Sequence, residues 1–393
     1  MNRYREPGTA GAVDEGGAPP PRSTRRRPSR WHRPLWWANV VAVGVLLITY
    51  LAPHVSPKTA WPLVLLAFSF PYQLVLHLGF LAWWALFRRK RMLLSGIALL
   101  LGFGHVGNTV QVLGASEPDG NPSGKPIALM SYNVRLFDLY NWAGNKRTRN
   151  AIFQQLHKAD ADILCLQEFF QSTDKRHFKT RDALLAEFRY TDVHEHYTLK
   201  AKFDQHFGIA TFSTYPIVKK GLVRFERKTN NVCIWSDIAV GSDTLRVYNA
   251  HLASYHFGDA DYKFIADLDT DTRSDSLKSG GWRILMRLKD GAEHRADEVE
   301  AIAAHMATSP HPVIFCGDIN DVPLSYAYHR LRGSKDDAFV ESGSGLGGTY
   351  LGKLPNLRID HILHDERLTS WDFRVWPEEL SDHSAISTTI AVR

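Results

Sequence analysis

VIFCGDIN, residues 313–320, is the stretch on which the interpretation of this sequence depends. Four apolar residues are followed by Gly317, Asp318, Ile319 and Asn320, which predicts a buried strand that ends abruptly and presents two polar side chains. A rigid strand that carries Asp and Asn to a sheet edge is a common way to build a site. An isolated G-D-x-N is also typical of a plain turn, because Asp and Asn bond their own backbone. The other strand ends must decide between these interpretations.

Charge and cysteine content narrow the class of protein. The 393 residues are 44% hydrophobic, enough for one large domain and a further region. Residues 1–116 hold 13 Lys and Arg against 3 acids, whereas residues 117–393 hold 34 against 38, a net charge of −4. The second part is therefore not a generic polyanion binder. Cys165, Cys233 and Cys316 lie in apolar runs without CxxC spacing, which favours buried residues over a disulfide framework or a zinc site.

The first part of the chain is predicted to hold a disordered basic tail and a membrane region. Residues 1–34 are rich in Gly, Pro and Ser and carry eight Arg, a composition that cannot bury a core. Apolar segments without any Asp, Glu, Lys or Arg follow at residues 35–52, 61–87 and 92–113. A helix of about 20 apolar residues spans a bilayer. We therefore expect about three transmembrane helices within residues 35–114, rather than three core helices of a soluble protein.

The positive charges predict how these segments are oriented. The arginine-rich tail precedes the first segment, Lys58 alone separates the first two, and RRKR at residues 88–91 separates the second and third. The positive-inside rule places the tail and the RRKR loop in the cytoplasm. Three crossings then put the rest of the chain in the periplasm or outside the cell. If the third segment does not cross, the rest of the chain is cytoplasmic instead.

Residues 115–125 are expected to form a turn-rich linker, and residues 126–393 an α/β domain. Helices are expected at 146–159, 181–188 and 294–307. Strands are expected at 127–134, 161–168, 208–218, 231–240, 244–252, 313–320, 358–365, 371–376 and 385–392. Strands outnumber helices and many are apolar on both faces, which predicts two packed sheets covered by helices. Residues 260–291 lack clear periodicity and are expected to be an inserted loop.

Polar residues recur at the ends of these strands. They are Asn133, Glu168, Asn249, His251, Asp318, Asn320, Asp360, Asp382 and His383. Each one alone could be an ordinary turn or surface residue. Together they are the side chains that phosphoester hydrolysis needs, and unrelated turns would not be expected to supply such a set.

Each chemical task has a candidate side chain. Glu168 and Asp382 offer the oxygen ligands that a hard cation such as Mg²⁺ takes. The asparagines can donate to phosphoryl oxygens, and Asp318 can orient and deprotonate a water molecule. A histidine oriented by a carboxylate, such as His383 with Asp360, can act beside the leaving oxygen.

The ordered motifs resemble the endonuclease/exonuclease/phosphatase superfamily, which has the DNase I-like fold. The motifs are SYNVR, LQE, GIATFSTYPI, NAHL, GDIN, RIDHIL and SDHSAI, and the resemblance covers about residues 126–393. It implies a four-layer α/β sandwich and hydrolysis of a phosphoester that depends on Mg²⁺, with Mn²⁺ as the alternative ion. The membrane segments would make this chain a membrane-anchored member of bacterial type.

The resemblance also implies roles for individual residues. Those implied to bind the metal are Glu168, Asp382 and Asn133. Those implied to bind the substrate are Asn133, Asn249 and Asn320. Those implied to be catalytic are His251, Asp318, Asn320, Asp360 and His383. Arg135 stands where the branch that cleaves at abasic sites commonly has an acid, which argues against DNA repair.

These observations lead to one main function and two alternatives. The main hypothesis is a membrane-anchored phosphodiesterase of nuclease type, acting outside the cytoplasm on nucleic acid. The first alternative is a sphingomyelinase-like or phosphoinositide-type enzyme that acts on a lipid headgroup at the bilayer. The second is a non-catalytic binding module, which the retained polar residues disfavour. No protein partner can be inferred from the sequence.

Overall fold

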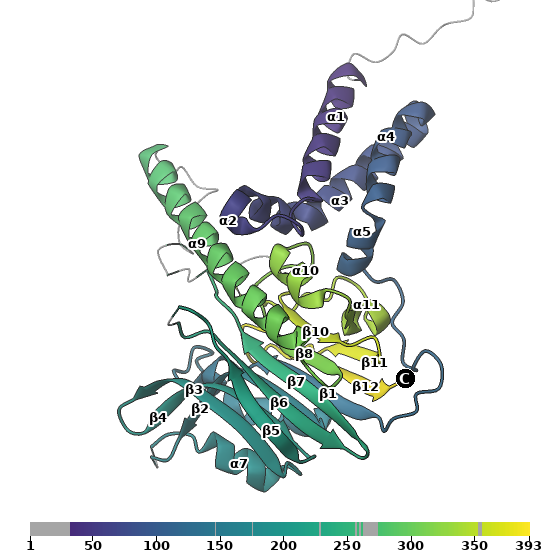
Figure 1. The fold of residues 1–393 in the computed structure, drawn as a ribbon. Coiled ribbons are helices and arrows are strands. Elements are labelled where there is room, and N and C mark those ends of the chain that lie inside the picture. The colour runs from purple at the N-terminus through teal and green to yellow at the C-terminus, as the bar shows by residue number, and fades with distance from the viewer. Residues whose placement is uncertain are drawn as a thin grey trace, which may run out of the picture. The chain divides into compact units, whose positions relative to one another are not determined.

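Two six-stranded mixed sheets form the body of residues 127–393 (Figure 1). The first has the strand order β11-β12-β1-β2-β4-β3 and the second β5-β6-β7-β8-β10-β9. The strands of the first are β1 (Ile127–Asn133), β2 (Ile163–Ser172), β3 (Asp192–Ala201), β4 (Gln205–Ser213), β11 (Leu368–Val375) and β12 (Ile386–Val392). The strands of the second are β5 (Ile217–Val223), β6 (Val232–Val240), β7 (Asp243–His251), β8 (Val313–Asp318), β9 (Asp336–Asp337) and β10 (Asp360–His364).

This computed structural model describes residues 32–145, 147–174, 176–227, 229–255, 258, 261, 274–352 and 356–393. Nearly all of the tail predicted at residues 1–34 lies outside the described residues. So does the first half of the loop predicted at 260–291, apart from residue 261.

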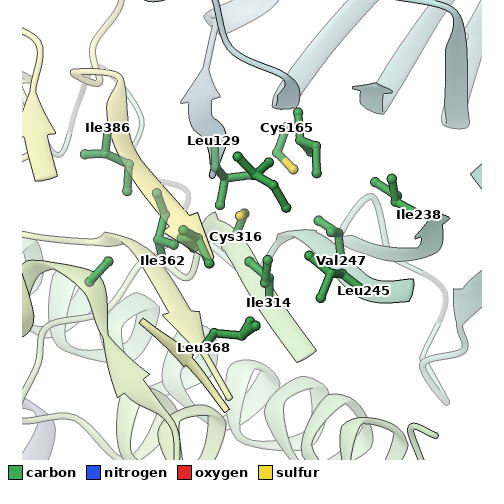
Figure 2. Packing of buried hydrophobic residues seen from close by; sticks show 14 of the residues in the cluster. Leu129, Cys165, Ile238, Leu245, Val247, Ile314, Cys316, Ile362, Leu368 and Ile386 are labelled. Carbon is green, nitrogen blue, oxygen red and sulfur yellow. The ribbon is translucent and has the colours of Figure 1, made fainter. Parts of the chain in front are cut away.

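The core lies where the two sheets face each other (Figure 2). Leu129 and Cys165 of the first sheet meet Val247, Ile314 and Cys316 of the second. β8 is buried along its whole length, as its unbroken apolar run predicts. Each fully buried side chain of this size stabilises the fold by roughly 1.5–3 kcal/mol relative to an exposed one. The three cysteines are free and buried, which confirms their predicted role as small core residues.

Helices cover the outer faces of both sheets (Figure 1). On the first sheet, α6 (Thr148–Ala159) buries Ile152 and Leu156 against Leu164, and α7 (Thr180–Glu187) lies beside it. On the second, α9 (Ser274–Ala307) and α10 (Tyr326–Arg332) bury Val299 and Leu331 against Phe315, and α11 (Ala338–Ser342) follows. The predicted four-layer sandwich with two mixed sheets is thus confirmed.

Parts of the prediction differ from the structure. The strand expected at 208–218 is two strands in different sheets, because Pro216 lacks the N–H that a continuous ladder needs. β3 was missed because it is an edge strand paired with β4 alone, so polar residues are tolerated along it. The loop expected at 260–291 is helical from Ser274, since α9 runs unbroken for 34 residues. Its charged surface hides the helical period.

The apolar N-terminal part folds into five helices within the described residues. They are α1 (His32–Thr49), α2 (Pro57–Ala60), α3 (Pro62–Phe87), α4 (Arg89–Leu101) and α5 (Phe103–Thr109). Among the residues that the structure describes, only α3 is by itself long and apolar enough to cross a bilayer. α4 and α5 would pass the same test as a pair, but they bend by 67° where they meet.

The bend replaces the continuous helix expected at 92–113. Gly102 lies between α4 and α5, and a Cβ there would lie 2.1 Å from the ring of Tyr50. The Tyr50 hydroxyl donates a hydrogen bond to the carbonyl of Ala98 at 3.0 Å. The Tyr50 ring is therefore packed against the backbone at Gly102, where the two helices meet.

Candidate active site

The sheet register brings the predicted polar residues to one edge. β7 and β8 are parallel, so His251 and Asp318 at their carboxyl ends lie opposite each other. β10 is antiparallel to β8, which places its first residue, Asp360, opposite Asp318 as well. In the first sheet, β1 and β2 are also parallel, and Asn133 ends β1 one residue short of the level of Glu168. Strand direction alone therefore gathers residues distant in sequence.

Asp318 is at the centre of this group, and its side chain is almost fully buried. Its Oδ2 accepts a hydrogen bond from Asn133 Nδ2 at 3.1 Å. Its Oδ1 accepts one from the backbone N–H of Asn320 at 2.9 Å. The Nε2 atoms of His251 and His383 lie 3.7 Å and 3.6 Å from Asp318 Oδ2. Burial raises the pKa of Asp318, and its two histidine neighbours offset part of that rise.

His383 and Asp360 form a buried pair. His383 Nδ1 lies 2.9 Å from Asp360 Oδ2, and both side chains are at most 6% exposed. Burial by itself would lower the pKa of His383, but the charges of Asp360 and Asp318 raise it above the ordinary value. The imidazole is thus held in its protonated form, with one nitrogen on Asp360 and the other toward Asp318. This is the pairing that the sequence suggested.

Glu168 reaches the same edge through a β-bulge. The pairing of β2 with β4 shifts register between Leu166 and Phe169, and Glu168 has a left-handed backbone with φ of +48°. The strand continues to Ser172, so Glu168 lies within β2 and not at its end as expected. Bulges redirect a side chain and are frequent beside active sites. Glu168 Oε1 lies 3.4 Å from Asn133 Nδ2 and 3.8 Å from His251 Nε2. The sequence carries no signal of this bulge.

Two sets of side chains could hold a divalent cation. Ligand atoms of Asp318, Asp360 and His383 all lie within 4.8 Å of one another. That set is fully buried, and a protonated His383 already offsets one of its two negative charges. The Glu168 side chain is 34% exposed, so its carboxylate can bind an ion that keeps several waters. We therefore favour Glu168 as the metal-binding side chain. The Asn133 oxygen, which was expected to join it, accepts instead from the backbone N–H of Arg135 at 3.1 Å.

Asp382, the other predicted metal ligand, lies at the rim. Its Oδ2 forms an ion pair with Arg135 Nε at 3.3 Å, its Oδ1 lies 3.2 Å from the Ser381 hydroxyl, and the side chain is 30% exposed. Asn133 is close to it, because the Ser381 hydroxyl donates to the Asn133 carbonyl at 2.8 Å. The Asp382 carboxylate, which was expected to bind the ion, is therefore paired with Arg135 instead.

Asn249 is placed in the core between the sheets and not among the carboxylates. Its Nδ2 donates to the carbonyl of Ala210 at 2.9 Å and to Thr211 Oγ1 at 3.2 Å. Its Oδ1 accepts from Gln167 Nε2 at 2.8 Å. These hydrogen bonds involve both polar atoms of the Asn249 side chain. Its described contacts are therefore structural, whereas the sequence suggested that it binds the substrate.

Arg295 and Glu298 of α9 bind the loops that follow His251 and Asp318. Arg295 is fully buried, donating from Nη1 to the carbonyl of Ala253 at 2.5 Å and from Nε to Asp321 Oδ2 at 3.2 Å. Glu298 accepts from the backbone N–H of Ala253 at 2.9 Å and from Asn231 at 2.6 Å. The loops after β7 and β8 are thereby joined. The signal in the sequence was two charged residues on the apolar side of the helix expected at 294–307.

Comparison with known families identifies the catalytic region. The family model described as the endonuclease/exonuclease/phosphatase family matches residues 130–383. The chain belongs to this family. The matched span contains every strand end discussed above, and the DNase I-like fold expected from the motifs is the observed one. A second model, a domain of unknown function (DUF8431), matches residues 32–109, which hold the apolar helices.

The chain is also similar to solved structures that hold different bound groups or bear different activity names. The human Nocturnin catalytic domain with bound sulfate has a TM-score of 0.49 and 17% identity, over 70% of this chain and 97% of that one. TDP2 from D. rerio, complexed with a single-strand DNA product, has a TM-score of 0.47 and 15% identity, over 68% of this chain and 100% of that one. The mannosyl-6-phosphatase Bt3783 of Bacteroides thetaiotaomicron has a TM-score of 0.47 and 16% identity, over 67% of this chain and 99% of that one. A comparison with curated proteins found no match.

Proposed function

We propose that this protein is a membrane-anchored phosphodiesterase that depends on a divalent cation, Mg²⁺ or alternatively Mn²⁺. The observation that carries the proposal is the convergence of Asn133, Glu168, His251, Asp360 and His383 around the buried carboxylate of Asp318. The family to which the chain belongs hydrolyses phosphoesters, and these are side chains that such a reaction uses. A nucleic acid is the first candidate substrate and a lipid headgroup the second.

Glu168 would hold the cation, with Asp382 reaching it if Arg135 releases the carboxylate. Asn133 would orient the carboxylates of Glu168 and Asp318, to which its Nδ2 donates. When bound, the ion supplies a Lewis acid that draws charge from the phosphoryl oxygens. The open side of Glu168 leaves room for the substrate and water ligands that Mg²⁺ retains.

The remaining side chains handle protons and charge. Asp318 accepts the proton of the attacking water, since burial raises the pKa of its carboxyl. The protonated His383, held by Asp360, donates a hydrogen bond to a phosphoryl oxygen as negative charge grows there. His251, whose side chain is 21% exposed, would give a proton to the leaving oxygen.

The test uses the full-length protein in detergent, with bis-p-nitrophenyl phosphate, DNA and RNA as substrates. We expect hydrolysis with Mg²⁺, loss of hydrolysis with EDTA, and recovery when Mg²⁺ is added in excess. Asp318→Asn should lower kcat by about 10²–10⁴-fold, because the water loses its base while the shape of the side chain is kept. Full activity in this variant, or in EDTA, would show that the reaction does not run as proposed.

A further inference from the structure

An apolar cavity of about 650 Å³ lies between the N-terminal helices and the catalytic region. Its helical wall includes Phe70 and Leu74 of α3 and Leu99 of α4, and its other wall includes Val322, Leu324 and Leu357. Val322 and Leu324 are buried in one cluster with Phe70 and Leu74. The volume falls within the roughly 300–1,000 Å³ of sites that bind small molecules.

The cavity wall is continuous with the loops that carry the candidate active site. Val322 follows Asn320 by two residues, and Leu357 precedes Asp360 by three. The N–H of Ile319 donates to the carbonyl of Ile359 at 3.0 Å, which joins these loops. Because an extended chain advances at most about 3.6 Å per residue, the wall begins within roughly 11 Å of the catalytic side chains.

The open side of the cavity is lined by apolar residues that water would not favour. Val75 and Leu78 of α3 are 70% and 58% exposed, and Leu100 and Phe103 are 71% exposed each. All four line the cavity, and α3 is the helix long and apolar enough to cross a bilayer. Clusters of exposed apolar side chains mark contact with a membrane or another apolar partner. In a bilayer, lipid chains would cover this side.

The charged residue among those that line the cavity is Arg358, which is 3% exposed. Its Nη1 donates to Asp337 at 2.8 Å and its Nη2 to the carbonyl of Asn108 at 2.7 Å. The guanidinium is thus bound within the protein, and the remaining lining is mostly apolar. Such a wall suits an acyl chain rather than a charged group.

We infer that the cavity binds one acyl chain of a bilayer phospholipid, and that the phosphoester of this lipid is the substrate cleaved at Asp318. The inference rests on the proposed function and selects the lipid over the nucleic acid as substrate. The net charge of −4 on residues 117–393 agrees with that choice, because nucleic-acid binding is driven by clustered basic side chains. The chain in the cavity would hold the headgroup at the loops of Asn320 and Asp360.

The first experiment fills the cavity without touching the catalytic residues. Gly96 lines it from α4, and an added Cβ there meets only Leu81 at 3.6 Å, so Gly96→Phe places a ring in the open volume. Gly79→Phe on α3 is the matched control, because a Cβ at Gly79 meets nothing within 4 Å and the residue does not line the cavity. Both variants are made in the full-length protein, reconstituted in phosphatidylcholine, phosphatidylglycerol and phosphatidylinositol vesicles.

We expect Gly96→Phe to lower hydrolysis of the vesicle phospholipid about tenfold or more, the loss that follows when about two methylenes are excluded from an apolar site. Hydrolysis of bis-p-nitrophenyl phosphate, which has no acyl chain, should stay unchanged, and Gly79→Phe should alter neither rate. Unchanged lipid hydrolysis in Gly96→Phe would overturn the inference. An equal loss on both substrates would overturn it too, as would cleavage of DNA or RNA but not of lipid.

A binding measurement separates this inference from the proposed activity. The Asp318→Asn protein in the same vesicles is irradiated with a phosphatidylcholine that carries a photoreactive group at the end of one acyl chain. We expect crosslinks in α3, α4 and residues 322–324, and their loss in the double variant with Gly96→Phe. Crosslinks without hydrolysis by the unaltered protein would refute the phosphodiesterase and keep the lipid site. Crosslinks confined to residues outside the cavity would refute the lipid site, whatever the activity.

Discussion

Asp318 shows how one buried side chain can organise a site. It accepts hydrogen bonds from Asn133 and from the Asn320 backbone, and two histidines approach it within 4 Å. A carboxylate so far from water would be costly if it were isolated. The protonated His383 supplies the compensating charge, and Asp360 holds that charge in place. The residues therefore depend on one another for both charge and position.

The pair of His383 with Asp360 predicts a pH-dependent stability. The pKa of His383 is raised in the folded protein by the neighbouring carboxylates. The protonated imidazole therefore stabilises the fold fully below about pH 6.5, the pKa of a histidine in the unfolded chain. This stabilisation is lost as the pH rises through the pKa of His383 in the folded protein. Asp360→Asn should therefore lower the Tm of the full-length protein at pH 6 in EDTA, and by less at pH 10. A Tm difference that is the same at both pH values would contradict the charge assignment.

Asn249 predicts a loss of stability rather than of substrate binding. Asn249→Ala removes the acceptor of Gln167 Nε2 and the donor to the Ala210 carbonyl. Leaving such buried groups unpaired costs about 1–3 kcal/mol each. We expect a clearly lower Tm with KM for bis-p-nitrophenyl phosphate within about twofold of the unaltered protein. A large rise in KM at unchanged Tm would restore the substrate-binding role that the sequence suggested.

Among the strands, the parallel pair β7–β8 sets the distance between His251 and Asp318. The two strands approach closely because Gly317 has no side chain, and a Cβ there would lie 2.3 Å from the Ala250 carbonyl oxygen. Because that oxygen belongs to the backbone, it cannot move away by a change of side-chain rotamer. The position of the catalytic carboxylate is thus tied to a close contact of two strands.

Gly317→Ala should separate these strands and move Asp318 from its neighbours. We expect a destabilisation of about 1–3 kcal/mol, the usual cost of overpacking, and a loss of activity larger than the loss of folded protein. Gly79→Ala is the control, since it adds the same methyl group in open space. The measurements are the thermal unfolding and the kcat of both variants. Normal kcat in folded Gly317→Ala would show that the contact does not position the carboxylate.

For the molecule as a whole, the number of membrane crossings decides where the reaction takes place. α3 is long and apolar enough to span a bilayer, whereas α4 and α5 are bent by 67° at Gly102. The arginine-rich tail and the RRKR loop favour the cytoplasm. We propose three crossings, by α1, α3 and the bent pair α4–α5, with the catalytic region outside the cytoplasm. Of these, α1 does not pass by itself the test of length and apolarity that α3 passes.

The topology is tested by fusing to Arg393 a reporter that fluoresces only in the cytoplasm. An odd number of crossings predicts dark cells, and a reporter active only outside the cytoplasm should give signal instead. A second fusion at Arg91, in the RRKR loop, should fluoresce in the cytoplasm. Bright cells with the Arg393 fusion would show an even number of crossings, with the bent pair α4–α5 as a re-entrant segment.

The sequence by itself determined the layered sandwich and most of the site. Apolar runs that end in polar residues, as in VIFCGDIN, reflect burial along the strand, and burial is a local property of the pattern. Only the tertiary structure decided which polar residues meet. The bulge at Glu168, the use of Asn249 inside the core, the Arg135–Asp382 pair, the support from α9 and the bend at Gly102 all arise from contacts between distant segments. No local pattern encodes such contacts, because each depends on the shape of a neighbour supplied by another part of the chain.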